Sequence, residues 1–206
     1  KLTREEQRAL DDMEREEQKN FASTQTEVEA VLAYAPNNSL FGSSYHRIPF
    51  PVGLWLYNGF VDSKTKMGKW IYRTFAATPV CISNVSPETR ARVATNTLHN
   101  FGYFRGRVDY TLLPQKDPRK AKIGYQVVMG PLSRFDSIEY RGFTPFMDSL
   151  LCTTSRLSAL KRGEAFSVLN LSEEQTRISN LFRENGFYYY SPEVVTYRAD
   201  TLQRRG

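Results

Sequence analysis

The sequence is poor in the residues from which enzymes most often build catalytic and metal sites. Among 206 residues there are two histidines, His46 and His99, and neither has further ligands nearby at the spacing of a metal site. The Gly-x-Ser-x-Gly, Gly-x-Gly-x-x-Gly and phosphate-loop patterns are missing. Carboxylates are plentiful, but pairs such as Asp11–Asp12 and Glu173–Glu174 fall on expected helix surfaces. The sequence therefore predicts a protein that is not an enzyme and that has no catalytic residue, metal or cofactor.

Cysteine is also scarce. The two cysteines, Cys81 and Cys152, are 71 residues apart. A fold held together by disulfides needs more cysteines, placed closer together. We therefore expect two unpaired, buried thiols, and this usage of cysteine does not indicate a cellular compartment.

Long apolar runs and concentrated charge are absent as well. No apolar run approaches the roughly 18–20 residues of a membrane-spanning helix, and no charged-then-apolar signal segment opens the chain. The net charge is +6, with Lys and Arg mixed among Asp and Glu. A nucleic-acid-binding protein would more often concentrate its positive charge, so we expect no nucleic-acid partner. Hydrophobic residues make up 40% and charged residues 24%, which is typical of a globular chain with one or two domains.

The sequence does contain a repeated pattern in which a helix, a glycine and a strand come one after another. In the first copy, Ser86 and Pro87 are suited to begin a helix, and Gly102 is suited to end it with a left-handed backbone. Two strands are expected next, one within 106–113 and one within 121–130. The first of them has β-forming residues at alternate positions, namely Val108, Tyr110 and Leu112.

The second copy opens with an expected strand at 133–142 and a helical stretch that ends at Gly163. Its second helix is expected to begin at a capping box formed by Ser172 and Gln175, and to end at Gly186. A strand is expected to come next, within 191–200.

Overlaid, the two copies give one β–α–α–β–β module with a repeat distance near 84 residues, with a helix at 26–35 as the earlier helix of the first copy. A period this long indicates an array of small domains. The glycines let the second helix of each copy turn directly into an edge strand, and the neighbouring aromatic residues close the helix end onto the sheet. Gly130–Pro131, where one copy ends and the next begins, is expected to be a short, stiff linker.

Four stretches resemble the tandem POTRA (polypeptide-transport-associated) domains of BamA- and TamA-like outer-membrane-protein assembly factors. YQVVMGPLSRFDSIEYRG (125–142) is similar to the POTRA junction, where a last strand ends in Gly-Pro and the next domain begins at once. PNNSLFG (36–42) and LWLYN (54–58) resemble the first domain of the TamA-like lipoprotein subgroup. Residues 160–190 are similar to the family's pattern of spaced glycine and apolar residues, with matches at Gly163, Phe166, Leu171, Ile178, Phe182 and Gly186.

The resemblance implies an α+β fold of two tandem POTRA-like β–α–α–β–β modules, with helices packed on one face of a small mixed sheet. A charged helix at 1–20 is expected to precede the first domain at 21–130, which carries a long insertion at 36–85. The second domain, at 131–206, is expected to be truncated at its last strand. The structural turns of the two modules are expected at Gly102, Gly130, Gly163 and Gly186.

The resemblance also implies a function. It implies a periplasmic interaction module of an outer-membrane-protein assembly or translocation factor, at the periplasmic face of the outer membrane of a Gram-negative envelope. Its expected partners are unfolded outer-membrane proteins, a periplasmic accessory subunit, and the parent protein's own C-terminal β-barrel, which this chain lacks. The expected mechanism is β-augmentation, in which an extended chain adds a strand to a sheet edge. The candidate edges are 106–112 and 192–198, with the residues Val108, Tyr110, Val194, Val195 and Tyr197.

Residues 41–75 hold nine aromatic residues, interleaved with Lys64, Lys66, Lys69 and Arg73. Such a composition occurs in a satellite core beneath an insertion, in a partner interface and at a membrane surface. The satellite core is the simplest interpretation. An alternative function also depends on this region, because a saccharide- or peptidoglycan-binding envelope protein would bind sugar through an aromatic patch of Trp55, Tyr57, Trp70 and Tyr72. A deep cleft with paired carboxylates would favour this alternative, and a shallow sheet groove would favour β-augmentation.

The N-terminal segment at 1–20 is charged and helix-prone. Thr3 and Glu6 can form a capping box, and the apolar stripe is thin. We expect a solvated helix loosely attached to the first domain, with a helix that binds a partner as the alternative.

Overall fold

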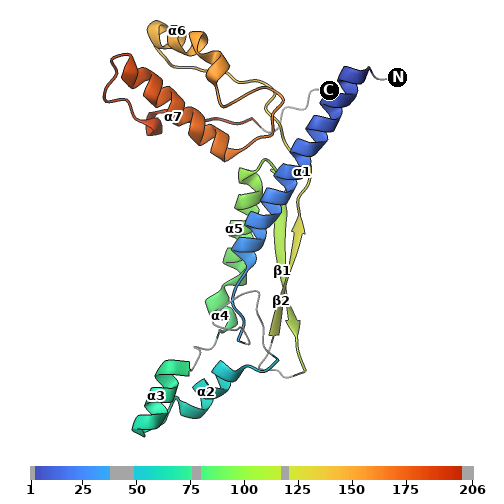
Figure 1. Ribbon diagram of the computed structural model, residues 1–206, viewed down its shortest axis with the longest axis vertical. Helices are drawn as coiled ribbons and strands as arrows, with labels where there is room; N and C mark the ends of the chain where they lie inside the picture. The colour runs from blue at the N-terminus through green and yellow to red at the C-terminus, as the bar shows by residue number, and fades with distance from the viewer. Residues whose placement is uncertain (1–2, 38–48, 76–79, 117–120, 201–206) are drawn as a thin grey trace. The chain divides into compact units, whose positions relative to one another are not determined.

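The computed structural model describes residues 3–37, 49–75, 80–116 and 121–200 (Figure 1). Predictions that concern Phe41, Tyr45, His46 and the turn at 117–120 lie outside these residues. The described chain has a mixed α+β fold, as expected, with a small sheet of two antiparallel strands. Its elements are α1 (Arg4–Leu32), α2 (Val52–Phe60), α3 (Lys66–Phe75), α4 (Ile82–Val85), α5 (Pro87–Asn100), β1 (Arg107–Pro114), β2 (Ala121–Val128), α6 (Pro145–Thr153), the 3-10 helix η1 (Ser155–Leu157), α7 (Val168–Glu184) and the 3-10 helix η2 (Pro192–Val194).

The chain forms two compact units, and neither is a continuous segment. One unit comprises Lys1–Gln25, Thr95–Arg107 and Val128–Gly206, and the other comprises Thr26–Ala94 and Val108–Val127. Helices α1 and α5 therefore contribute residues to both units. These units are groups of residues in close contact. The domain boundaries expected at 20/21 and 130/131 are boundaries between separately folding domains, and they stay predictions.

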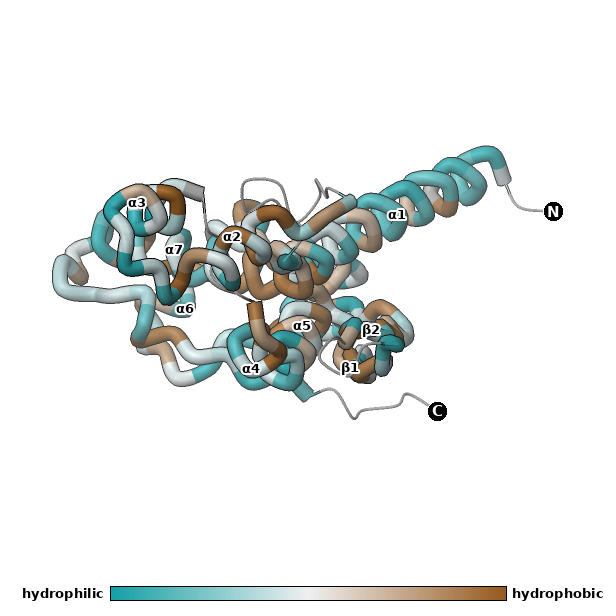
Figure 2. Tube along the Cα trace, turned by 90° about the horizontal axis from the view of Figure 1, so that it is seen from below, coloured by the Kyte–Doolittle hydropathy of each residue, from teal (hydrophilic) through white to brown (hydrophobic). Residues whose placement is uncertain are grey.

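Helix α1 is continuous over Arg4–Leu32, where the sequence predicts separate helices at 1–20 and 26–35. Neither Gly nor Pro occurs between these residues, so nothing in the local sequence interrupts the helix. The predicted capping box is confirmed, since the Thr3 N–H donates to Glu6 Oε2 over 2.6 Å and the Glu6 N–H donates to Thr3 Oγ1 over 3.3 Å. Figure 2 shows mostly hydrophilic residues along the N-terminal part of this helix.

Helices α5 and α7 end with the same backbone hydrogen bonds. In each, the N–H of the residue after a glycine donates to the carbonyl five residues earlier, as in the Schellman motif. The predicted positive φ is present in both glycines, at +89° in Gly102 and +98° in Gly186. Gly130 and Gly163 have positive φ as well. The two hydrogen bonds are Tyr103 N–H to Leu98 O and Phe187 N–H to Phe182 O, each 3.0 Å long.

The correspondence extends along both helices at a constant spacing of 84 residues. The buried apolar positions match, and one turn earlier each helix has a charged residue, partly buried in α5 and fully buried in α7. The segments after the two helices differ, because α5 leads into β1 whereas α7 leads into an irregular segment and η2. The repeat inferred from the sequence is thus present in the two helices and their ends. The matched pairs are Arg90 and Glu174, Ala94 and Ile178, and Leu98 and Phe182.

Substitution by alanine is expected to destabilise the fold more at Gly102 than at Gly186, although both glycines have positive φ. A Cβ on Gly102 would lie 2.9 Å from the Phe166 carbonyl oxygen, whereas a Cβ on Gly186 would meet nothing within 4 Å. We expect Gly186→Ala to lower the free energy of unfolding by about 1 kcal/mol through backbone strain alone. Gly102→Ala should cost about 2 kcal/mol or more, because the Phe166 backbone must also move. Urea unfolding monitored by circular dichroism measures both, and equal losses would contradict the role of the Phe166 contact.

The strands of the first copy are confirmed as β1 and β2, but the strand predicted at 133–142 is wrong over most of its length. The structure has only a bridge between Arg134 and Ala165 there. The Phe135 N–H donates to the Glu164 carbonyl over 3.0 Å, and the Phe166 N–H donates to the Ser133 carbonyl over 2.9 Å. Farther along this stretch Tyr140 packs against the α6–α7 core, so its aromatic character reflects core packing.

The helix boundaries of the second copy also differ from the prediction. Helix α7 begins at Val168, and its cap is Ser167, whose Oγ accepts from the Leu169 N–H over 3.2 Å. The predicted cap Ser172 lies inside the helix. Helix α6 ends at Thr153, well before Gly163. In its last turn the hydroxyls of Thr153 and Thr154 donate to backbone carbonyls of the helix, a local bonding pattern that disfavours continuation.

Helices α6 and α7 enclose an aromatic core. Its buried residues are Met147 and Leu151 from α6, Ile178 and Phe182 from α7, and Val195. The Phe182 ring is central, with ring centroids of Phe143, Phe187 and Tyr190 at 5.6, 6.0 and 4.8 Å. These separations lie in the range of favourable tilted and edge-to-face aromatic contacts.

The two cysteines are only partly as expected. Cys81 and Cys152 are unpaired, as predicted, but both are exposed rather than buried. Among the described residues, no helix combines the length and the apolar character needed to cross a bilayer.

Candidate functional site

The β1–β2 hairpin presents an apolar surface on an open sheet. The described sheet has two strands, so each of them lies at an edge. Only Val108 of β1 is buried, while Tyr110 and Leu112 are exposed, and β2 has no buried residue. Helix α5 lies beside the hairpin in Figures 1 and 2. Of the candidate edge residues in this copy, Tyr110 lies on the exposed surface and Val108 belongs to the core.

The second candidate edge, 192–198, is not a strand, and this prediction is wrong. Pro192 begins η2, and the Val195 N–H donates to its carbonyl over 3.1 Å. The Val195 carbonyl accepts from Gln175 Nε2 over 2.7 Å, so both main-chain polar groups of Val195 are occupied within the chain. The Val195 side chain is buried in the α6–α7 core, and the Tyr197 hydroxyl donates to the Leu171 carbonyl over 2.9 Å. Two of the three candidate residues here thus serve the core, and only Val194 is exposed.

The four residues of the candidate aromatic patch lie on the α2–α3 helical hairpin, which spans 50–75. Tyr57 and Tyr72 are half-buried, and their ring centroids are 5.6 Å apart between the helices. Trp55 and Trp70 are more than half exposed, at 57% and 59%. Among residues 50–74 only Gly68 is buried. The satellite core expected here is therefore wrong for Trp55 and Trp70, which are exposed, while Tyr57 and Tyr72 pack on each other without being fully buried.

A buried carboxylate links α7 to the segment that precedes it. Glu174 is completely buried, which corrects its expected place on the helix surface. Its Oε1 accepts from the Tyr140 hydroxyl and from Arg177 Nη2, each over 2.6 Å. Its Oε2 accepts from Arg177 Nε and from the Ala159 N–H, each over 2.9 Å. A sequence signal was present, because Glu174 precedes Ile178 and Phe182 at intervals of four residues on the buried face of α7.

The electrostatics of this cluster result from its geometry. Burial alone would raise the pKa of Glu174, but the hydrogen bonds from Arg177, Tyr140 and Ala159 outweigh it and hold the pKa below its usual range. The Tyr140 pKa is raised by burial and by its bond to Glu174, and the Arg177 pKa is raised by Glu174. Burial and the nearby Glu174 charge also raise the pKa of Tyr197. Both carboxylate oxygens are engaged by donors of the chain, so the cluster ties α7 to the segment that precedes it.

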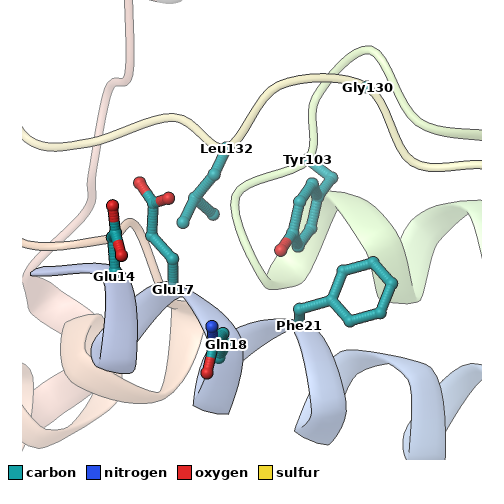
Figure 3. Close-up of a pocket in the computed structure, with 7 residues that line it drawn as sticks. All are labelled: Glu14, Glu17, Gln18, Phe21, Tyr103, Gly130 and Leu132. Carbon is teal, nitrogen blue, oxygen red and sulfur yellow. The ribbon is translucent and has the colours of Figure 1, made fainter. Parts of the chain in front are cut away.

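A shallow groove of about 600 Å³ runs beside α1 in the unit that contains its N-terminal part (Figure 3). Tyr103 and Leu132 point toward the helix, and Phe21 lies below Tyr103. Glu17 is engaged, because its Oε1 accepts from Arg134 Nη2 over 2.8 Å. The Tyr103 pKa is raised by burial and by the Glu17 charge. The groove is open, and its ionisable lining residues are Glu14, Glu17 and Tyr103. The remaining lining residues are Gln18 and Gly130.

In the other unit, Arg90 closes the end of α1. Its Nη1 donates to the carbonyls of Val31 and Ala33, each over 2.9 Å, and its Nε donates to Val85 O over 2.9 Å. The last turn of α1 has no cation of its own, so Arg90 supplies the positive charge that favours the carboxyl end of a helix. The sequence interpretation missed this role. Arg90 is thereby a structural residue, equivalent by position to Glu174.

The part of the chain that the structure describes offers no metal site. Within these ranges, no group of three or more His, Cys, Asp or Glu side chains is placed to hold a metal ion. The His99 ring contacts the Gly106 carbonyl through Nε2 at 3.2 Å and packs near Phe104. No protein-family model, curated protein or solved structure matches the chain.

Proposed function

We propose that the chain is a periplasmic interaction module of an outer-membrane-protein assembly or translocation factor, and that it binds unfolded outer-membrane polypeptides by β-augmentation. The observation that carries the proposal is the open two-stranded sheet with exposed apolar residues on both strands, including Tyr110, Leu112 and Val127. An exposed apolar edge accepts an extended chain through main-chain hydrogen bonds, which depend little on the sequence of the added strand.

In this proposal the chain consists of two tandem POTRA-like modules. Helix α5, the turn at Gly102 and the β1–β2 hairpin correspond to the second helix and last two strands of the first module. Helices α6 and α7 correspond to the helix pair of the second. The shared helix ends and the constant spacing of 84 residues support this assignment. The proposed place of action is the periplasmic face of the outer membrane, where a periplasmic accessory subunit is a further proposed partner.

The proposed strand addition takes place at the β1–β2 hairpin and not at residues 192–198. Residues 192–198 lack a strand, and the main-chain groups of Val195 are engaged with Pro192 and Gln175. Strand addition is therefore expected at the hairpin alone, where β1 and β2 each offer an edge.

The mechanism can be tested with a synthetic peptide that copies one alternating strand of an outer-membrane protein. In an added strand, the N–H groups of every second residue face the sheet edge. N-methylation of the odd-numbered residues and of the even-numbered residues should therefore have unequal effects. One series should lose binding to the full chain by about tenfold or more, and the other should bind as the unmodified peptide does. Equal affinities for both series in fluorescence anisotropy would overturn strand addition.

A pair of substitutions tests the same surface from the protein side. We expect Leu112→Lys combined with Val127→Lys to weaken peptide binding by about tenfold, since lysine on an edge strand opposes pairing. Both side chains are exposed, so the fold should persist in circular dichroism. Leu157→Lys is the matched control, because this leucine is exposed but lies on η1, outside the sheet. Unchanged binding by the double variant would contradict the hairpin as the site.

A further inference from the structure

The α2–α3 hairpin differs in charge from the rest of the chain. Between Glu29 and Glu88 the only acidic residue is Asp62. The hairpin contains four cations against this single carboxylate, which gives it a net charge of +3. A chain that otherwise mixes its charges therefore has one strongly cationic segment. The cations are Lys64, Lys66, Lys69 and Arg73.

The same segment exposes large apolar side chains. Helix α2 has no buried residue, although most of its residues are apolar. Met67 is 73% exposed, and the Phe50 ring lies 5.8 Å from that of the exposed Trp55. Solvent-exposed tryptophans and phenylalanines grouped on one short hairpin mark an interaction surface. The exposed apolar side chains are those of Phe50, Val52, Trp55, Val61, Met67 and Trp70.

Helical geometry places cations and an aromatic residue together on α3. Lys66, Trp70 and Arg73 are spaced at intervals of four and three residues, so they lie on a single stripe of the helix. Tyr72 faces α2 instead, as its contact with Tyr57 shows. The basic and aromatic stripe is thus directed away from the helix–helix contact.

We infer that the α2–α3 hairpin binds the surface of a bilayer that contains anionic lipids. Tryptophan favours the headgroup level of a bilayer, where its apolar ring and its N–H are both accommodated. Lysine and arginine near the surface are attracted to anionic headgroups, and the positive charge of this hairpin is complementary to them. A helix that lies in the interface typically combines Trp, Phe or Leu with Lys and Arg, and the hairpin has both kinds of residue exposed. This surface is separate from the β1–β2 edge, so it would hold the chain at a membrane while the edge binds a polypeptide.

The chain provides its own probe for this interaction. Its only two tryptophans are Trp55 and Trp70, and both lie exposed on the hairpin. Adding vesicles of phosphatidylglycerol and phosphatidylcholine to the full chain should shift the tryptophan emission to shorter wavelength, and pure phosphatidylcholine vesicles should shift it much less. Raising the salt concentration should reverse the shift, because salt screens exposed charges. No shift with the anionic vesicles would overturn the inference without any substitution.

A charge-matched pair of variants identifies the surface. Lys66→Gln, Lys69→Gln and Arg73→Gln together should lower the vesicle partition coefficient by about 100-fold, since each cation near an anionic surface contributes about fivefold. The control variant, Lys19→Gln with Arg92→Gln and Arg156→Gln, removes three exposed cations elsewhere and should bind almost as the parent does. Equal losses in both variants would overturn the assignment to the hairpin. An emission shift with single-stranded DNA or with peptidoglycan fragments, but not with vesicles, would overturn it in favour of a polyanion or a saccharide.

Discussion

Replacing Glu174 by alanine is expected to lower the free energy of unfolding by about 3 kcal/mol. Glu174 is completely buried and accepts four hydrogen bonds, two of them from Arg177, whose side chain is only 18% exposed. Removing the carboxylate leaves Arg177 with a hydrogen bond to Thr154 but without its counter-charge, and breaking a buried ion pair is costly. Urea unfolding monitored by circular dichroism measures the loss.

Glu173 provides the matched control for this substitution. It is the neighbouring residue of the same type on the same helix, but its side chain is exposed. Glu173→Ala should change the stability by less than about 0.5 kcal/mol, as surface substitutions usually do. Similar losses for the two alanine variants would contradict the importance of the buried cluster.

The same cluster predicts a dependence of stability on pH. The pKa of Glu174 is lower in the folded chain than its usual value. The ionised cluster therefore contributes its full stability above the usual glutamate range, and the contribution is lost as the pH falls through the folded-state pKa. The unfolding free energy of Glu174→Gln, which has no charge to lose at this position, should fall less on acidification than that of the parent. Parallel pH profiles for the two proteins would show that Glu174 does not carry the effect.

Phe182→Ala is expected to destabilise the α6–α7 core by about 3–5 kcal/mol. The side chain is completely buried, and removing it leaves a cavity among Phe143, Phe187 and Tyr190. The expected result is a large decrease in the urea midpoint and a loss of near-ultraviolet circular dichroism from the surrounding rings.

Phe146 is the control for the core substitution. It belongs to α6 and contacts the Phe187 ring at a centroid separation of 6.2 Å, but it is 55% exposed. Phe146→Ala should therefore cost about 1 kcal/mol or less, because little apolar surface is withdrawn from water at this position. A cost for Phe146→Ala equal to that of Phe182→Ala would contradict the placement of the core.

The sequence predicted those parts of the fold that local chemistry determines. The capping box at Thr3, the helix ends at Gly102 and Gly186, and the strands β1 and β2 all depend on residue types at fixed short spacings. Each of these features needs only neighbouring residues, so a sequence pattern is sufficient to predict it.

The features that the sequence did not predict depend on partners distant in the chain. The β-forming residues Val195 and Tyr197 resemble a strand, but Gln175 and Leu171 engage them in the core. Glu174 resembles a surface residue, but Tyr140 lies 34 positions earlier and donates to it. The aromatic residues around Trp55 resemble a core, yet Phe50, Trp55 and Trp70 are each more than half exposed. Tertiary partners decide between these alternatives, and local propensity does not encode them.

The discontinuous composition of the units has a consequence for the order of events during synthesis. The N-terminal part of α1 belongs with residues beyond Val128, and Arg134 comes 117 positions after its partner Glu17. A ribosome that adds about 5–20 residues per second produces Arg134 roughly 6–23 s after Glu17. During most of that interval Tyr103 and Leu132, which line the groove beside this helix in the folded chain, have not yet been made. The nascent helix is therefore a segment on which a chaperone can act before the chain is complete.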